Sequence, residues 1–244
     1  MSTTLQADVS LHPEQQHDKD KEKVSAIRLA LRMVIGLAFY GALLFIPAGS
    51  FAYTAGWIFL GTMLLMFAVV TPYFYRNHQD LLRRRMKTKE KEKEQKLIMG
   101  IAALGGFGAI IVCGLDFRFG WSQMPIELII AGNIGIFLSY MGVCWVLIVN
   151  EFAGRTIEVD EGQKVISTGP YAWVRHPMYS FVMLVVLAFP FGLGSYYALP
   201  IFVLVFGAVF HLRMVHEEKF LHNELEGYTE YTKKVKSRII PFIW

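Results

Sequence analysis

The sequence is short of charge and of cysteine. Only 18% of its 244 residues are Asp, Glu, Lys or Arg, whereas 54% are hydrophobic and the mean hydropathy is +0.40. This composition excludes a disordered chain and lies outside the usual range of soluble domains. The two cysteines, Cys113 and Cys144, cannot form a disulfide-stapled small domain, and packing is their expected role because both lie in apolar stretches. The sequence also has no repeat of fixed period and no Asn-x-Ser/Thr acceptor.

Long stretches without any Asp, Glu, Lys or Arg are present instead, at 33–75, 97–115, 128–150 and 176–212. A helix that crosses a bilayer needs roughly 20 apolar residues. The first stretch is too long for one span and is broken at 47–50, and the fourth is broken by Pro and Gly at 190–195. We therefore predict an all-α integral membrane protein with six transmembrane helices. They are expected at about 27–46, 53–73, 97–115, 128–150, 177–189 and 196–212, the last two being short for full spans.

The basic residues predict the orientation of these helices. With an even number of spans both termini lie on one side, and 23 of the 24 Lys and Arg then fall on that side. Arg118 alone falls in an outer loop. Because basic residues are enriched in cytoplasmic loops, both termini and the cofactor pocket are predicted to face the cytoplasm.

The chain is expected to have three parts. Residues 1–23 are a polar and mobile tail without the apolar core of a signal peptide. Residues 24–149 form four transmembrane helices, with a basic cytoplasmic loop at 76–96 that contacts anionic lipid headgroups rather than nucleic acid. Residues 150–244 form a catalytic region that consists of a loop, a short membrane hairpin and a C-terminal helix.

Polar side chains gather at 151–179 and at 211–231, two segments that the membrane hairpin can bring together on the cytoplasmic side. The first predicts two short extended pieces around a tight turn at Gly162. In the second, Arg213 and Glu217 are four residues apart and share one face of a helix. A snorkelling Arg213 paired with Glu217 is the structural alternative to a functional role.

Two other patterns carry no site. The spacing of His216 and His222 is not that of a known metal motif, so no metal is predicted. The glycines at 105–108 lie inside a predicted span with no strand before them. They therefore indicate close helix packing rather than a nucleotide-binding loop.

Three motifs near the C-terminus identify a relationship. They are Gly169-Pro-Tyr-Ala-Trp-Val-Arg-His-Pro-Met-Tyr179, then Arg213-x-x-x-Glu217-Glu218, then Gly227-Tyr-x-x-Tyr231 followed by Arg238-Ile-Ile-Pro-Phe242. In this combination they resemble the isoprenylcysteine carboxyl methyltransferase family and its phospholipid methyltransferase relatives. The resemblance covers roughly residues 150–244.

The resemblance implies methylation that depends on S-adenosylmethionine, at the cytoplasmic membrane face and without a Rossmann-type domain. It implies that the cofactor is bound by Gln163, Lys164, Val165, Ile166, Tyr171, His176, Pro177, Met178, Tyr179 and Glu217. Arg213 matches a position on the acceptor side, and Arg213 and His176 are the predicted catalytic residues. The residue types suit the cofactor, because its sulfonium, ammonium, carboxylate and adenine require an acid, donors and aromatic surface.

The acceptor is predicted less sharply than the donor. A carboxylate, such as that of a prenylated cysteine entering from the bilayer, needs positioning and desolvation but no general base, and Arg213 could hold it by a bidentate contact. A phospholipid or small-molecule amine or thiol would require a proton acceptor, for which His176 and Glu218 are the nearby candidates. A non-enzymatic membrane scaffold or transporter is the third alternative, which the complete motifs disfavour.

Overall fold

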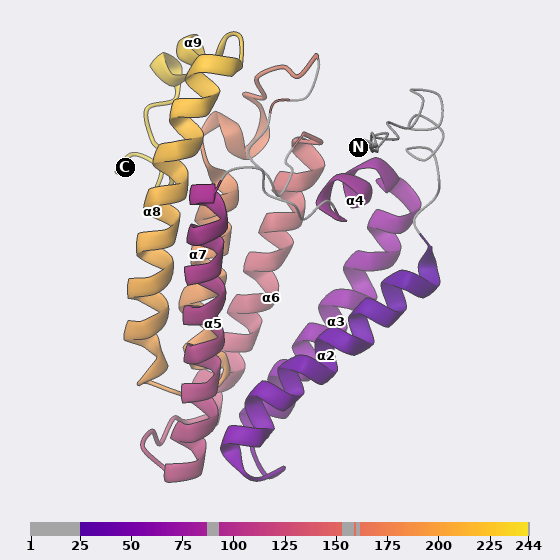
Figure 1. Ribbon diagram of the computed structural model, residues 1–244, viewed down its shortest axis with the longest axis vertical. Coiled ribbons are helices and arrows are strands. Elements are labelled where there is room, and N and C mark those ends of the chain that lie inside the picture. Colours follow the sequence, from indigo (N-terminus) through magenta and orange to yellow (C-terminus); the bar gives the residue numbers. More distant parts are fainter. Residues whose placement is uncertain (1–24, 87–92, 153–158, 160–161, 244) are drawn as a thin grey trace, which may run out of the picture.

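The computed structural model describes residues 25–86, 93–152, 159 and 162–243, and within them it contains helices but no strand (Figure 1). The all-α prediction is therefore confirmed. The predicted tail at 1–23, part of the basic loop and most of the first extended piece before Gly162 lie outside the described residues. The α-helices are α2 (Ala26–Ala48), α3 (Thr54–Asn77), α4 (Gln79–Met86), α5 (Lys93–Phe119), α6 (Ile126–Val149), α7 (Pro177–Gly192), α8 (Ala198–Glu224) and α9 (Tyr228–Lys234), and a 3-10 turn, η1, covers Gly169–Ala172.

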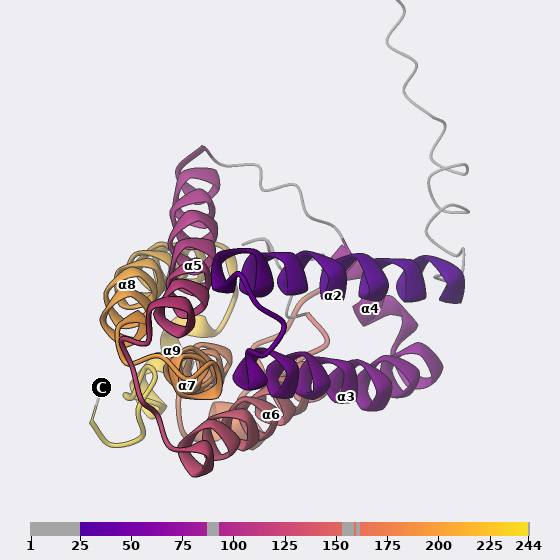
Figure 2. The same ribbon diagram turned by 90° about the horizontal axis from the view of Figure 1, so that it is seen from below.

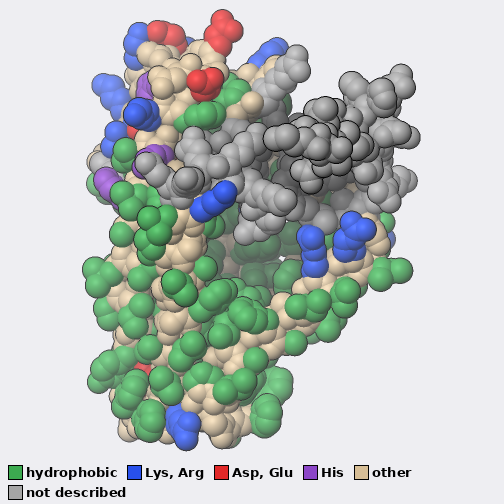
Figure 3. Space-filling model, in the orientation of Figure 1, with side chains coloured by type: hydrophobic (Ala, Val, Ile, Leu, Met, Phe, Trp, Pro, Cys, Tyr) green, Lys and Arg blue, Asp and Glu red, His purple; other side chains and the backbone are tan. Residues whose placement is uncertain are grey.

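Five of these helices, α2, α3, α5, α6 and α8, are long and apolar enough to cross a membrane. The space-filling view in Figure 3 agrees, because charged side chains gather at the end with α9 while hydrophobic side chains cover most of the rest of that face. The chain is thus an integral, multi-pass membrane protein. The helix predicted at 177–189 is present as α7, which has 16 residues and is shorter than the other five.

The prediction for the last span was wrong in its length. The helix expected to stop near 212 continues without interruption to Glu224 and has 27 residues. The charge-free stretch ends at Leu212 because Arg213 follows, but a charged residue ends an apolar run and not a helix. As a result, the apolar span and the polar segment with Arg213 and Glu217 form one continuous rod.

The five candidate membrane spans and the shorter α7 form a closed ring of neighbouring helices (Figure 2). Going round, α2 packs on α5, α5 on α8, α8 on α7, α7 on α6, α6 on α3, and α3 on α2. Glycines permit close approaches between neighbouring helices. A Cβ atom at Gly105 would overlap Val205 of α8, and one at Gly132 would overlap the backbone N of Gly192 in α7. The packing role predicted for the glycines at 105–108 is thus confirmed for Gly105.

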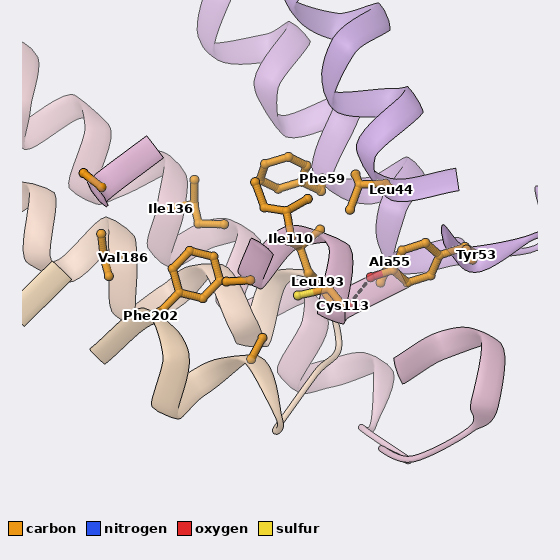
Figure 4. Packing of buried hydrophobic residues seen from close by; sticks show 14 of the residues in the cluster. Leu44, Tyr53, Ala55, Phe59, Ile110, Cys113, Ile136, Val186, Leu193 and Phe202 are labelled. Atoms are coloured by element: carbon orange, nitrogen blue, oxygen red, sulfur yellow. Dashed lines mark hydrogen bonds between the residues drawn. The ribbon is translucent and has the colours of Figure 1, made fainter. Parts of the chain in front are cut away.

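The main hydrophobic core lies between the helices of this ring, with residues from α2, α3, α5, α6, α7 and α8. Leu44, Phe59 and Ile136 come from α2, α3 and α6, and the fully buried Leu193 follows α7 (Figure 4). The Tyr53 hydroxyl donates a hydrogen bond to the carbonyl of Leu193, and this pair is drawn in the same view. Both cysteines are buried and unpaired with one another, as expected of packing residues.

At the end of the bundle opposite α9, a buried carboxylate ties the loops together. Asp116, at 1% exposure, accepts hydrogen bonds from the backbone N–H of Ser122 (2.6 Å) and from the hydroxyls of Ser122 (2.7 Å) and Ser195. The Ser195 hydroxyl in turn accepts from the N–H of Ala198, the first residue of α8. This network closes that end of the ring around otherwise unsatisfied helix-terminal groups.

At the α9 end, the C-terminal segment is fastened to the start of α7. The N–H groups of Arg175 and His176 donate to the carbonyls of Ser237 (3.0 Å) and Arg238 (2.9 Å). Glu218 of α8 lies between these segments. Its carboxylate is 2.7 Å from Arg175 Nη1, 3.1 Å from Arg238 Nε and 3.2 Å from His176 Nε2. We call these four residues the Glu218 clamp, and it joins α8, the loop before α7 and the C-terminal segment.

We expect Glu218→Ala to destabilise the protein by on the order of 3 kcal/mol, because it leaves the largely buried Arg175 without its carboxylate partner. The measurement is thermal unfolding in detergent, together with the rate at which a protease removes the C-terminal segment. Glu230→Ala is the matched control, since the Glu230–Lys233 pair is exposed and such pairs contribute at most about 1 kcal/mol. Equal unfolding temperatures for the two variants would contradict the clamp.

Candidate functional site

A cavity of about 380 Å³ lies at the α9 end of the bundle, within the volume range of small-molecule sites. Its walls come from α4, α5, the end of α6, the loop at 163–171, and α7, α8 and α9. In Figure 3 the surface is hollowed between α5 and the α2–α3 pair, below the grey residues. The cavity therefore lies where the polar end of the ring meets its apolar body.

The structure brings all of the predicted site residues to this cavity. Those that line it are Gln163, Lys164, Val165, Ile166, Tyr171, His176, Pro177, Met178, Tyr179, Arg213 and Glu217. They come from a loop and two helices that are distant in sequence. The structure shows that these residues line one cavity, whereas their roles in binding a cofactor stay predictions.

Tyr171 is positioned by contacts from two sides. Its hydroxyl accepts a hydrogen bond from Asn150 Nδ2 at the end of α6 (2.9 Å), and its carbonyl accepts one from the Tyr231 hydroxyl of α9 (2.7 Å). Burial raises the pKa of Tyr171 to about 12; the hydrogen bond from Asn150 acts in the opposite direction, and nearby Glu217 raises it further. Tyr171 thus keeps its proton at neutral pH and is a hydrogen-bond donor on the cavity wall.

The loop that leads to Tyr171 begins with a turn at Gly162. Gly162 has φ of +74°, in the left-handed region that glycine adopts without strain. This agrees with the turn predicted there. Beyond it, Val165 packs with Leu225 and the two tyrosines of α9, so the loop is held against the end of α8.

A negatively charged residue, Glu217, and a positively charged residue, Arg213, share one face of α8 at the cavity. The Tyr179 hydroxyl of α7 donates to Glu217 Oε2 at 2.6 Å. Arg213, one turn earlier on α8, also interacts with the Tyr179 hydroxyl through a hydrogen bond and its positive charge. The cavity therefore presents a carboxylate and a guanidinium within a single helical turn, which suits a ligand or ligand pair with charges of both signs.

His176 is the N-cap residue that precedes α7 and is nearly inaccessible to solvent, at 5% exposure. Pro177 occupies the first helical position, where its missing N–H is tolerated, and this fixes the direction in which α7 leaves the loop. The His176 Nε2 faces Glu218, so the ring orientation is set by the Glu218 clamp.

Glu218 is unsuited to the proton-acceptor role that the sequence left open for it. It is not among the residues that line the cavity, and its carboxylate is engaged by two guanidinium groups and an imidazole. It is a structural anion that holds the site together. Among the described residues no group of three His, Cys, Asp or Glu side chains could hold a metal ion.

Sequence reasoning missed several residues of the cavity. Tyr228 and Tyr231 belong to the third motif, but no role was assigned to them. Both are buried, and burial raises the pKa of each well above its usual value. Arg85 of α4 and Met99 of α5 also line the cavity, although they come from the half of the chain in which no site was predicted. No spacing within the sequence connects them to the motifs.

The remaining wall is apolar. It includes Val182 of α7 and Phe206, Val209 and Phe210 of α8. The rings of Tyr179 and Phe210 are 5.7 Å apart, and those of Phe210 and Phe206 are 5.8 Å apart, so aromatic surface continues from the polar groups toward the membrane helices. A ligand with a polar head and an apolar chain matches this division.

A family model matches the part of the chain that carries most of the motifs. Residues 128–226 match the model of the family described as phospholipid methyltransferase. Over 92 residues the chain is 33% identical to the Delta(14)-sterol reductase of Mus musculus, a match that covers 37% of this chain but only 22% of the mouse protein. A solved structure of the eukaryotic intramembrane Ras methyltransferase, isoprenylcysteine carboxyl methyltransferase, aligns with 84% of this chain and 75% of its own, at 19% identity and a TM-score of 0.48.

The family match extends from α6 to just beyond α8. It includes Tyr171, the start of α7 with His176 and Tyr179, and the part of α8 with Arg213 and Glu217. The relationship indicated by the motifs is thus confirmed at the level of this region. Residues 128–226 are therefore the part of the chain that is similar to the phospholipid methyltransferase family.

Proposed function

We propose that the protein is an S-adenosylmethionine-dependent methyltransferase that acts on a lipophilic acceptor entering from the bilayer. The observation that carries this proposal is a cavity at which all the predicted site residues meet an apolar wall of membrane helices. Such a cavity can hold a polar donor and an apolar acceptor side by side, which is what a transfer between them requires.

The residues on the cavity wall fit the cofactor. Glu217 offers a carboxylate for an ammonium group, and Tyr171 offers a hydroxyl donor. The segment 163–166 offers main-chain groups, and the rings of Tyr179 and Phe210 offer aromatic surface for a base. When bound, S-adenosylmethionine supplies a methyl group on a positively charged sulfur.

For the acceptor we propose a carboxylate, as in a prenylated cysteine or a similar amphiphile. Arg213 can hold it in place, and a carboxylate is already ionised at neutral pH. An amine or thiol would first have to lose a proton, whereas Glu218 is held by Arg175 and Arg238, and His176 Nε2 faces Glu218. These engagements favour the carboxylate over the phospholipid amine or the thiol.

We also propose that the cavity faces the cytoplasm and that the basic segment around α4 contacts anionic lipid headgroups. The support is the excess of Lys and Arg on the side of the bundle that carries both predicted termini. Anionic lipids attract such segments by about 1 kcal/mol per basic residue.

The similarity to a sterol reductase favours a second candidate, the reduction of a lipophilic substrate in the same cavity. This chemistry needs a hydride donor such as a reduced nicotinamide. The two candidates are separated by which cofactor the purified protein binds.

The function is tested by following radiolabelled methyl transfer from S-adenosylmethionine to N-acetyl-S-farnesylcysteine and, in parallel, to phosphatidylethanolamine. We expect incorporation into the farnesylated carboxylate. Incorporation into phosphatidylethanolamine alone would replace the acceptor, and binding of a reduced nicotinamide but not of S-adenosylmethionine would favour the reductase.

We expect Glu217→Gln and His176→Ala to weaken the binding of S-adenosylmethionine about ten- to a hundredfold, because each removes a polar partner at the cavity. Calorimetry in detergent measures this effect. Glu226→Gln, an exposed acid outside the cavity, is the control and is expected to bind normally. Unchanged affinity in both cavity variants would refute the cofactor assignment.

We expect Arg213→Ala to reduce turnover at least a hundredfold while cofactor affinity stays within about threefold, and Arg213→Lys to recover part of the turnover, because Lys keeps the charge but loses the bidentate fork. The measurement pairs the methyl-transfer rate with calorimetry. Lys219→Gln, on the exposed side of α8, serves as the control. If cofactor binding and turnover fell together, Arg213 would have a structural role instead.

A further inference from the structure

Tyr228, the first residue of α9, has a buried hydroxyl that makes no hydrogen bond. The residue is 4% exposed, and its Oη has no partner among the residues that the structure describes. Tyr228 also lines the cavity. Because a buried hydroxyl without a partner is unfavourable, such a group at a cavity wall indicates a ligand that satisfies it.

The neighbouring Tyr231 shows that the fold does not need the Tyr228 hydroxyl. The Tyr231 hydroxyl donates to the carbonyl of Tyr171 (2.7 Å) and so fastens α9 to the loop before α7. The rings of Tyr228 and Tyr231 are 5.9 Å apart in one buried cluster. Packing and the Tyr231 hydrogen bond therefore hold α9 in place, and the Tyr228 hydroxyl is left for another purpose.

The ring of Tyr228 is held by its neighbours. It meets the ring of His222 edge to face, with 5.0 Å between the centroids, and it packs in the buried cluster with Leu225. The turn into α9 is made at Gly227, whose φ of +82° lies in the left-handed region. The hydroxyl is thus fixed before a ligand binds, which lowers the entropic cost of binding.

Charged groups of the cavity surround this hydroxyl. Burial raises the pKa of Tyr228 above its usual value, the charge of Glu218 raises it further, Arg175 lowers it, and Glu217 raises it. Tyr228 therefore keeps its proton at neutral pH and acts as a donor. Because Arg175 and Glu217 line the same cavity, a ligand that binds between them also comes close to the Tyr228 hydroxyl.

Arg175 has a second donor without a partner. Its Nη1 is 2.7 Å from Glu218 Oε1, but its Nε is buried and makes no hydrogen bond within the part of the chain that the structure describes. Two donors, on Tyr228 and Arg175, thus accompany the carboxylate of Glu217 at one cavity. An α-amino acid group has the complementary pair, since its carboxylate accepts hydrogen bonds and its ammonium pairs with an acid.

Tyr228 lies at the polar end of the cavity. Leu221 of α8 packs against its cluster, whereas the apolar wall is made by Phe210 and by residues before it on the same helix. Leu221 follows Phe210 by eleven residues, which corresponds to about 16 Å along an α-helix. The group that Tyr228 meets therefore belongs to the polar ligand and not to the chain of the lipophilic acceptor.

We propose that the Tyr228 hydroxyl and the Nε–H of Arg175 bind the carboxylate of the methionyl part of S-adenosylmethionine, beside the ammonium that Glu217 receives. This inference rests on the proposed function for the identity of the ligand. It adds to the site a residue of α9, which lies beyond the region 128–226 that matches the family model. Tyr228 is then a binding residue that recognises the amino acid part of the cofactor.

The test is calorimetric binding of two probes to the full chain in detergent: S-adenosylmethionine and decarboxylated S-adenosylmethionine, which lacks the carboxylate. Tyr228→Phe removes one hydroxyl and keeps the ring. Two controls carry the same change: Tyr231→Phe removes a hydroxyl that has a partner, and Tyr197→Phe removes an exposed one at the opposite end of the bundle. The unfolding temperature of each ligand-free variant is the second readout.

We expect Tyr228→Phe to weaken the binding of S-adenosylmethionine about tenfold and that of the decarboxylated probe less than twofold, because the hydroxyl meets only the carboxylate. The unfolding temperature of ligand-free Tyr228→Phe should not fall, since the change removes an unsatisfied buried hydroxyl. Tyr231→Phe should unfold a few degrees lower, because its hydroxyl is bonded. Tyr197→Phe should change neither quantity.

An equal loss of affinity for both probes, or unchanged binding of S-adenosylmethionine by Tyr228→Phe, would overturn the carboxylate site. A lower unfolding temperature of ligand-free Tyr228→Phe would also overturn it, because the hydroxyl would then be structural. Failure of the proposed function gives a different result. Binding of S-adenosylmethionine that depends on Tyr228 but leads to no methyl transfer would retain the carboxylate site and reject the transferase.

Discussion

The carboxylate of Glu218 is the interaction on which the α9 end of the molecule depends. It is buried beside the guanidinium of Arg175 and the imidazole of His176 from the loop before α7, and beside the guanidinium of Arg238 from the C-terminal segment. A charge in that position is tolerated only when its partners are present, so α8, the loop before α7 and the C-terminal segment must assemble together. The cavity is the space that this assembly encloses. Groups that face the cavity, such as Tyr179 and Glu217, are then positioned by this assembly.

Each end of the bundle contains a buried carboxylate, and the two carboxylates are stabilised by different kinds of partner. At the far end Asp116 accepts hydrogen bonds from the hydroxyl and backbone donors of nearby loops, and the ring is closed there. At the α9 end the partners are long, charged and drawn from distant segments, and space is left between them. The first arrangement fills the interior, whereas the second surrounds a volume in which a polar ligand can find partners. The apolar core between them keeps the two ends apart.

Much of the fold follows from the sequence because membrane spans need uninterrupted apolar runs. The predicted helices at 27–46 and 53–73 correspond to α2 and α3 within a few residues. The extent of α8 could not be obtained in this way, since hydropathy changes at Arg213 while helical hydrogen bonding does not. The cavity residues were found where local motifs carried them, as with His176 and Tyr179. Arg85 and Met99 were missed because only tertiary packing of α4 and α5 brings them to the site.

The shortness of α7 has a consequence for the depth at which chemistry can occur. Its 16 residues span about 24 Å, whereas the hydrocarbon core of a bilayer is about 30 Å thick. The helix that carries Pro177 and Tyr179 at its first turn therefore begins below the level of the lipid headgroups when its other end is at the opposite boundary. An apolar helix shorter than the hydrocarbon core is accommodated when the bilayer thins locally around it or when flanking side chains reach toward the interface. An amphiphile with its charge close to its apolar chain can then reach the cavity without leaving the membrane, and the thickness of the host membrane becomes part of the environment of the site.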